Sequence, residues 1–217
     1  MQRVKGLGMP ERTLPADYLS LIEENGFAVV NSAISRSEVK QLRQAISRIP
    51  AGEEVRKKKN VYGIRNLLDV CAEIRTLAAS STLRKFVECV LGANSFAVRA
   101  IFFDKVPSAN WRLQFHQDCT ISVRQKIETE GFTAWSTKAG VTQVRPPESI
   151  LQQMISVRVH LDDCHGENGA LRILMGSHRK VWGLEQIPDC RARFVEETCE
   201  VPEGGLLVMR PLVLHAS

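Results

Sequence analysis

The chain has 217 residues, of which 44% are hydrophobic and 24% are charged, which is typical of a globular domain and excludes a disordered chain. No apolar run approaches the roughly 18 residues that cross a bilayer, and the start lacks the apolar stretch of a signal peptide, so we expect a soluble cytoplasmic protein with no membrane partner. The net charge is +5, but its one tight basic run, Arg56–Lys59, has no interleaved aromatic residues, so we expect a solvated loop and no nucleic-acid partner.

Residues 1–93 are predicted to be mainly helical, because apolar residues recur there at helical spacing between recognisable start and stop signals. Ser35 and Glu38 form a capping-box pattern, which is typical of a helix start. Glycine is a common residue just after a helix, and Gly26 and Gly92 occupy such positions. The predicted elements are a helix at 16–25, a short strand at 27–30, a helix after Ser35 and a helix at 81–91.

After residue 94 the pattern changes to short apolar or alternating segments separated by turn residues. Strands are expected at 95–104, 112–118, 155–161, 170–174 and 205–214. Several short strands of this kind indicate an antiparallel sandwich or barrel. Residues 119–150 interrupt the series and are expected to form a long functional insertion, either a lid or a binding loop. The sequence therefore predicts a single domain over 1–217, with β-structure over 94–217.

The candidate metal site begins with His116 and Asp118. Residues two apart on a strand point to the same face, so an imidazole and a carboxylate can reach one ion. His215, at the end of an apolar strand, is the candidate third ligand. Two histidines and one carboxylate form the facial triad of non-haem Fe(II) oxygenases. His116 and Asp118 alone are weak evidence for a metal site, because a buried core histidine and an aspartate in a turn or helix cap would produce the same sequence pattern.

Five further segments extend the pattern well beyond these three residues, and through them the sequence resembles the phytanoyl-CoA dioxygenase family. They are Arg99–Lys105, Trp111–Asp118, Val157–Cys164, Glu167–Arg179 and Gly204–Ser217. The resemblance implies a mainly β fold with N-terminal helices and a double-stranded β-helix core, which is a cupin-like jelly-roll. It also implies Fe(II) as cofactor, 2-oxoglutarate and O2 as co-substrates, and His116, Asp118 and His215 as the iron ligands.

The resemblance also implies a 2-oxoglutarate pocket that contains Ser217, Arg158 and Ile101. For Arg158, a surface arginine on an edge strand is the alternative. The family anchors the distal carboxylate of 2-oxoglutarate with an arginine about ten residues beyond the distal histidine, and the printed sequence ends at Ser217. We therefore expect a C-terminally truncated form, and the alternative is a variant that lost this anchor.

The expected activity is hydroxylation of a small organic molecule or acyl derivative, with succinate and CO2 as co-products. Two other classes remain open, namely a catalytically inactive jelly-roll binding protein and a cupin-type metalloenzyme that needs no 2-oxoacid. The sequence leaves the substrate, the position that is oxidised and the oligomeric state open. The residues expected to face the substrate are Gln114, Trp135, Tyr62, Arg65 and Asn66.

Overall fold

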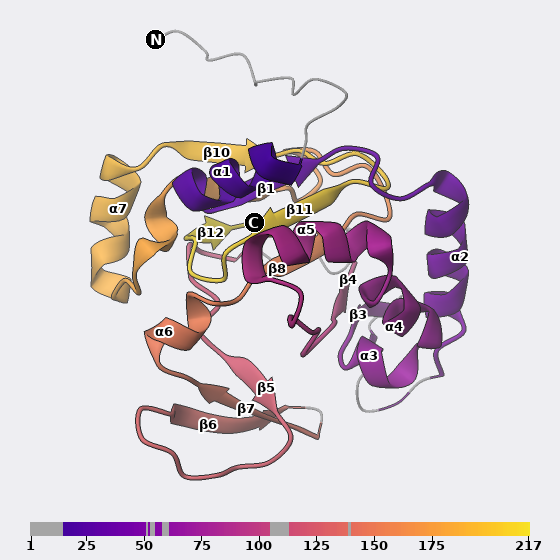
Figure 1. The fold of residues 1–217 in the computed structure, drawn as a ribbon, viewed down its shortest axis with the longest axis horizontal. Helices are drawn as coiled ribbons and strands as arrows, with labels where there is room; N and C mark the ends of the chain where they lie inside the picture. Colours follow the sequence, from indigo (N-terminus) through magenta and orange to yellow (C-terminus); the bar gives the residue numbers. More distant parts are fainter. Residues whose placement is uncertain (1–14, 51, 53–54, 58–60, 105–112, 139) are drawn as a thin grey trace, which may run out of the picture.

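The computed structural model describes residues 15–50, 52, 55–57, 61–104, 113–138 and 140–217. The helices are α1 Pro15–Asn25, α2 Arg36–Ser47, α3 Leu67–Val70, α4 Ala72–Ala78, α5 Ser81–Leu91, α6 Glu148–Leu151 and α7 Ile187–Arg193, with 3-10 turns η2 Ser177–Arg179 and η3 Leu184–Gln186. The strands are β1 Phe27–Val30, β2 Val55–Lys57, β3 Val61–Ile64, β4 Phe102–Phe103, β5 Ile121–Val123, β6 Thr133–Lys138, β7 Val141–Arg145, β8 Ser156–Val159, β9 Leu171–Leu174, β10 Glu196–Cys199, β11 Leu206–Met209 and β12 His215–Ala216. Figure 1 shows their arrangement.

Helices α1, α2 and α5 begin or end at residues that the sequence predicted. Helix α1 ends at Gly26, whose φ of +86° suits glycine. Helix α2 starts with a complete capping box, in which the Ser35 side chain accepts from the Glu38 N–H and the Glu38 carboxylate accepts from the Ser35 N–H. Helix α5 stops before Gly92, as expected. The predicted strand at 27–30 is also present as β1.

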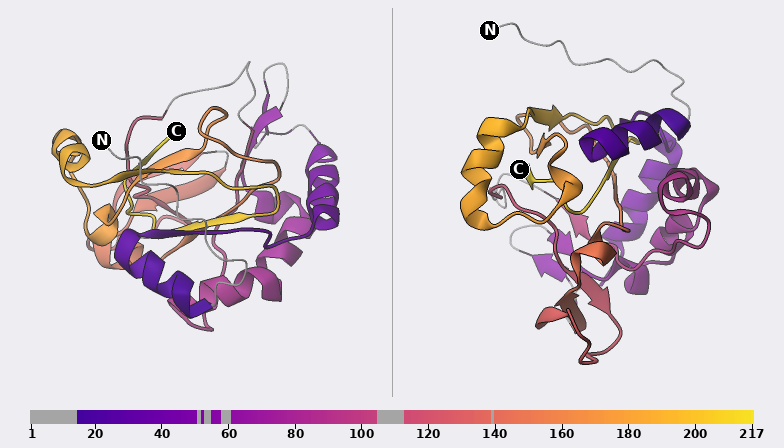
Figure 2. Two further views of the ribbon diagram at one scale, coloured as in Figure 1. Left: turned by 90° about the horizontal axis from the view of Figure 1, so that it is seen from above. Right: turned by 60° about the vertical axis from the view of Figure 1, so that its left-hand side comes forward.

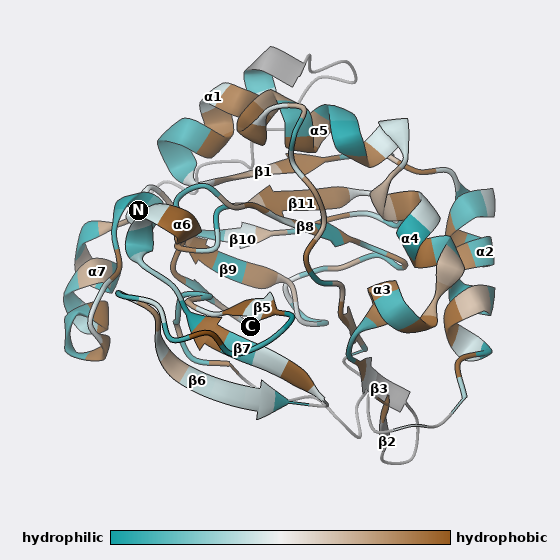
Figure 3. Ribbon diagram, turned by 60° about the horizontal axis from the view of Figure 1, so that its bottom comes forward, coloured by the Kyte–Doolittle hydropathy of each residue, from teal (hydrophilic) through white to brown (hydrophobic). Residues whose placement is uncertain are grey.

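The core is a sandwich of two antiparallel three-stranded sheets, with the strand orders β1-β11-β8 and β10-β9-β12. Strand β11 is buried on both faces: Leu206 and Val208 pack under α1 and α5, and Leu207 and Met209 pack between the sheets. Figure 3 shows α1 and α5 covering β1, β11 and β8, with β11 apolar throughout. This arrangement confirms the predicted jelly-roll core, and its alternation decides which side chains of β8 point inward.

The segment 119–150 differs from the expected lid or loop. It forms a third antiparallel sheet, with the order β5-β7-β6, followed by α6. Strands β6 and β7 form a hairpin around Gly140, which has a φ of +73°. Figures 1 and 2 show this sheet projecting from the sandwich as a separate arm. The turn signal at Gly140 was present in the sequence, but the polar composition of β6 masked the strand.

Two expected strands are much shorter than predicted. Of the segment 95–104, only Phe102 and Phe103 are in a strand, because Phe96 and Val98 are 80% and 45% exposed and the segment gains little from burial. Of the segment 113–118, only His116 forms an isolated bridge, and Arg112 lies outside the described residues. No helix in the described part of the chain is long and apolar enough to cross a membrane.

Candidate metal centre

The proposed ligands come from two chain segments that pair side by side. His116 and His215 exchange backbone hydrogen bonds, each with an N–O distance of 3.0 Å. Leu113 and Ser217 form a second reciprocal pair, with N–O distances of 2.8 and 3.1 Å. A residue pair of this type places both side chains on the same face of the ladder. A short antiparallel ladder therefore brings together two histidines that are 99 positions apart in the sequence.

The side chains of His116, Asp118 and His215 converge on this face. One possible ligand atom from each lies within 4.8 Å of the other two. The His215 Nε2 is 3.8 Å from the Asp118 Oδ2, and the two imidazole centroids are 4.3 Å apart. The side chain of His215 is 2% exposed, whereas that of Asp118 is 49% exposed. The cluster therefore has a buried side at His215 and an open side at Asp118.

Both imidazoles are oriented by backbone carbonyl groups. The His116 Nδ1 lies 2.7 Å from the Gln114 carbonyl oxygen, and the His215 Nδ1 lies 2.9 Å from that of Val213. A carbonyl oxygen only accepts, so each Nδ1 carries the proton and each Nε2 keeps its lone pair for an ion. Burial lowers the pKa of His215 to about 4, which keeps its ring neutral at physiological pH. This donor set fits a divalent transition metal.

Gln117 holds the ligand segment in place, although the sequence reading gave it no role. Its Nε2 donates to the carbonyl oxygens of Lys180 and Leu212, and its Oε1 accepts from the Trp182 N–H at 2.8 Å. One side chain thus connects the segment of His116 and Asp118 to the chain that leads into His215. Alternation would have placed Gln117 away from the ion, but its three partners are distant in sequence and could not be inferred.

Ser177 holds the chain segment that leads into His215. This fully buried hydroxyl donates to the Leu174 carbonyl oxygen at 2.7 Å and accepts from the Leu214 N–H at 2.8 Å. The hydroxyl therefore connects β9 to the residue just before His215. Ser177 lies in the matched segment Glu167–Arg179, and the structure shows that it supports the metal centre.

Arg158, expected in the co-substrate pocket, points into the sandwich. Its neighbours Val157 and Val159 pack toward the helices, and its partner across the ladder is Leu207, whose side chain lies between the sheets. Burial lowers the pKa of the guanidinium, while the electrostatic attraction of Asp118 raises it. The Arg158 Nε is buried and has no hydrogen-bond partner among the described residues. A buried guanidinium nitrogen without a described partner is suited to an anionic ligand.

His160 follows Arg158 toward the same interior. Burial, and then the charge of Arg158, lowers the pKa of His160 to about 4. Its Nε2 is also buried without a hydrogen-bond partner in the part of the chain that the structure describes. The interior next to the metal centre therefore has two side chains with a buried nitrogen that lacks a described partner, which makes this part of the interior polar.

The remaining expected site residues lie on several parts of the chain. Ser217 and Gln114 lie on the ladder of the two histidines, and Ile101 precedes β4 with a half-buried side chain. Arg65 and Asn66 follow β3, and Asn66 has a left-handed backbone with a φ of +59°. Trp135 lies on β6, the strand of its sheet that does not pair with β5, and its Nε1 is buried without a described partner. The backbone of Tyr62 is in β3, and its side chain lies outside the description.

Arg99 is a charged residue beside the centre that the sequence reading did not select. Its half-buried guanidinium interacts electrostatically with Asp118 and Arg65. The available signal was strand alternation, because Ile101 was already expected to face the pocket and Arg99 is two residues before it.

Comparison with known proteins agrees with this architecture. The family model described as Phytanoyl-CoA dioxygenase (PhyH) matches residues 22–217. No curated protein sequence matches the chain significantly.

Three solved structures show the same fold at low identity. EctD from S. alaskensis, solved with 2-oxoglutarate and 5-hydroxyectoine, is 15% identical over 98% of this chain and 72% of its own, with a TM-score of 0.72. The non-heme alpha ketoglutarate dependent carbocyclase SnoK from nogalamycin biosynthesis is 15% identical over 97% and 80%, with a TM-score of 0.67. AviO1 from Streptomyces viridochromogenes Tue57 is 16% identical over 94% and 86%, with a TM-score of 0.66.

The family match covers almost the whole described chain, and the solved structures share its fold. The metal-binding geometry found on the ladder of His116 and His215 has the donor types that this family uses with Fe(II) and 2-oxoglutarate. The chain belongs to the phytanoyl-CoA dioxygenase family and is a non-haem iron, 2-oxoglutarate-dependent oxygenase.

Proposed function

We propose that the chain hydroxylates a small organic molecule or acyl derivative and releases succinate and CO2 as co-products. In this proposal the iron ligands are the Nε2 atoms of His116 and His215 and a carboxylate oxygen of Asp118. The observation that carries the proposal is the convergence of these donors within 4.8 Å beside the buried guanidinium of Arg158. Arg158 is a cationic group on the buried side of the triad, where a 2-oxoacid can bind. Asp118 is half exposed, so a substrate can approach from the opposite side.

The protein's own part in the reaction is to bind and orient. The carbonyl groups of Gln114 and Val213 keep the Nε2 atoms of the two histidines directed at the ion. Arg158 donates N–H groups to a carboxylate of 2-oxoglutarate, since a guanidinium forms short, charge-assisted hydrogen bonds with carboxylates. When bound, Fe(II) supplies the redox chemistry that couples decarboxylation of 2-oxoglutarate to the insertion of one oxygen atom of O2 into a C–H bond.

The surroundings of the triad are assigned in the same proposal. Ser217 and Ile101 complete the co-substrate pocket, and Gln114, Arg65 and Asn66 face the substrate. Trp135 forms its outer wall. The described residues form one oxygenase domain. We place the protein in the cytoplasm, because all six cysteines are free thiols, as is usual in a reducing compartment.

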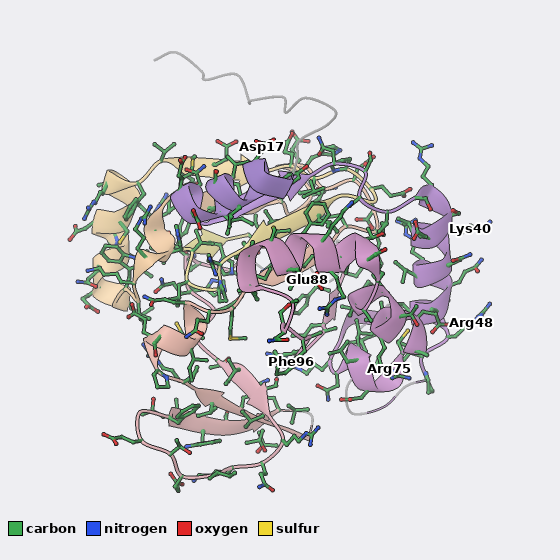
Figure 4. All side chains as sticks on the ribbon, in the orientation of Figure 1. Asp17, Lys40, Arg48, Arg75, Glu88 and Phe96 are labelled. Atoms are coloured by element: carbon green, nitrogen blue, oxygen red, sulfur yellow. The ribbon has the colours of Figure 1, made fainter. Side chains whose placement is uncertain are left out.

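The test is the conversion of 2-oxoglutarate to succinate under air with added Fe(II), with and without candidate organic acids as substrates. We expect succinate formation that depends on Fe(II) and is lost in Asp118→Ala, which removes a ligand and leaves both histidines. Arg48→Ala is a suitable control, because this exposed side chain at the end of α2 points away from the body of the molecule (Figure 4). Metal binding without succinate would contradict the proposal and favour a 2-oxoacid-independent metalloenzyme.

A further inference from the structure

Two arginines lie together beside the open side of the metal centre. Strands β3 and β4 pair with Gly63 opposite Phe103 and Ile64 opposite Phe102, so Arg65 comes next to Ile101. The Leu67 N–H donates to the Ala100 carbonyl oxygen at 3.1 Å, which keeps the two chain segments together beyond the strands. Arg99 belongs to this second segment, and its charge interacts with that of Arg65. The backbone therefore brings the two segments together, and the guanidinium groups of Arg99 and Arg65 are close enough to interact electrostatically.

The charge of Arg99 is in an unfavourable environment. Burial lowers the pKa of Arg99, and the charge of Arg65 lowers it further. Among the described residues, Arg99 has neither a hydrogen bond nor an ion pair. Its one favourable electrostatic partner is Asp118, whose negative charge would be matched by a bound cation in the loaded enzyme. Filling the metal site thus makes the surroundings of Arg99 more positive and increases the need for an anion.

The position of the pair differs from that of Arg158. Arg158 interacts with Asp118, Cys199 and Cys164 and lies toward the buried side of the centre. Arg99 interacts with Asp118 and Arg65 and comes from the segment before β4. Arg158 also acts on His215, whose side chain is 2% exposed, whereas Arg99 acts on Asp118, whose side chain is 49% exposed. Arg99 therefore approaches the side that is open to an incoming molecule.

We propose that Arg99 and Arg65 bind an oxyanion group of the molecule that is hydroxylated, either a carboxylate or a phosphate. This inference rests on the proposed function, and it narrows the substrate class to small organic acids and phosphate esters. A guanidinium has N–H groups in a planar fork that matches both oxyanions, and two such groups can bind one oxyanion together. Anchoring the oxyanion beside Asp118 would hold the rest of the substrate at the metal centre.

The test separates this oxyanion from the carboxylates of 2-oxoglutarate by two calorimetric titrations. Inorganic phosphate is titrated into the metal-free chain at constant ionic strength, and 2-oxoglutarate is titrated into the Mn(II)-loaded chain. We expect saturable phosphate binding that is weakened about ten-fold or more in Arg99→Gln and in Arg65→Gln, with 2-oxoglutarate affinity changed less than about three-fold. Arg158→Gln should show the reverse pattern. Arg48→Gln, which removes the same charge at a distant exposed site, should change neither.

Two kinds of result would overturn the inference. Loss of 2-oxoglutarate affinity in Arg99→Gln with unchanged phosphate affinity would assign the pair to the co-substrate. Phosphate binding that is absent in the unsubstituted chain, or equal in all variants, would show that the pair binds no oxyanion. Thermal unfolding of each variant, together with Arg99→Lys, separates lost binding from lost folding, since lysine keeps the charge. If the chain binds phosphate at Arg99 but never binds 2-oxoglutarate, the proposed function fails and the oxyanion site remains.

Discussion

His116 and His215 face each other across a two-way backbone hydrogen-bond pair, with both N–O distances at 3.0 Å. Because the pair fixes both backbones, the distance between the imidazoles depends on the ladder and not on two independent loops. Their rings are 4.3 Å apart between centroids, and a carbonyl group holds each Nδ1. The site is therefore preorganised, and changes that loosen the ladder should weaken metal binding even when all three ligands are intact.

Gln117→Ala tests this relationship directly. The substitution leaves three main-chain groups, on Lys180, Leu212 and Trp182, without their partner. We expect metal affinity to fall about 10- to 100-fold, as for other residues that orient ligands, and the free energy of unfolding to fall by about 2 kcal/mol. Calorimetric titration with Mn(II) and urea unfolding measure the two effects. Gln114→Ala is the matched control, since only its backbone contacts His116, and equal losses in both variants would refute the role of Gln117.

Arg158→Met should separate stability from binding. Methionine retains the apolar length of the side chain and removes a buried charge whose Nε has no described partner. We expect the metal-free variant to be about 1 kcal/mol more stable than the original chain, while its 2-oxoglutarate affinity falls about ten-fold or more. Urea unfolding measures the expected gain in stability, and titration of the Mn(II)-loaded protein with 2-oxoglutarate measures the expected loss of affinity. A destabilised variant with normal affinity would indicate a purely structural arginine.

Gly26→Ala should be costly for two separate reasons. A φ of +86° is unfavourable for alanine, and its Cβ would lie 2.6 Å from the His178 Nδ1 and 3.0 Å from the Val213 Cγ2. Gly92 offers a matched control, because it also follows a helix, with a φ of +81°, and has no atom within 4 Å of an added Cβ. We expect Gly92→Ala to cost about 1 kcal/mol and Gly26→Ala about 2–4 kcal/mol in unfolding free energy. Equal losses of unfolding free energy in the two variants would show that the His178 side chain moves away from the added Cβ without strain.

Divalent metal should stabilise the folded chain through the triad. A ligand at 100 times its dissociation constant adds about 2.7 kcal/mol if the unfolded chain does not bind it. We expect Mn(II) to raise the midpoint of thermal unfolding in the original chain and to have little effect in Asp118→Ala. Arg48→Ala should respond like the original chain. The same rise in Asp118→Ala would place the ion elsewhere.

The sequence predicted best where the physical signal is local. The limits of α1, α2 and α5 follow from Gly26, the capping box of Ser35 and Glu38, and Gly92, each of which acts within a few residues. Alternation along the expected strand at 155–161 also agrees with the structure, where Arg158 and its valine neighbours lie on opposite faces of β8. These features depend on side-chain periodicity and helix-end hydrogen bonds and need no knowledge of distant contacts.

The sequence predicted least where distant segments decide the outcome. The alternation around Phe96 and Val98 resembles a strand, but no partner strand covers these residues and they stay exposed. The arm of β5, β6 and β7 closes through its own hairpin, which the polar sequence of β6 concealed. The hydrogen bonds of Gln117 reach Lys180 and Leu212, and the charge contact of Arg99 reaches Asp118. Only a three-dimensional structure reveals pairs of this kind.

The most direct test of the central claim is an anaerobic titration of the chain with Fe(II) and 2-oxoglutarate, followed by visible absorption. Chelation of iron by the 2-oxoacid gives a weak metal-to-ligand charge-transfer band. We predict that the band saturates in the original chain and in Arg48→Ala and is absent in His116→Ala, while the circular dichroism of all three stays the same. No band in the folded original chain, or an equal band in His116→Ala, would contradict the assignment of iron to His116, Asp118 and His215.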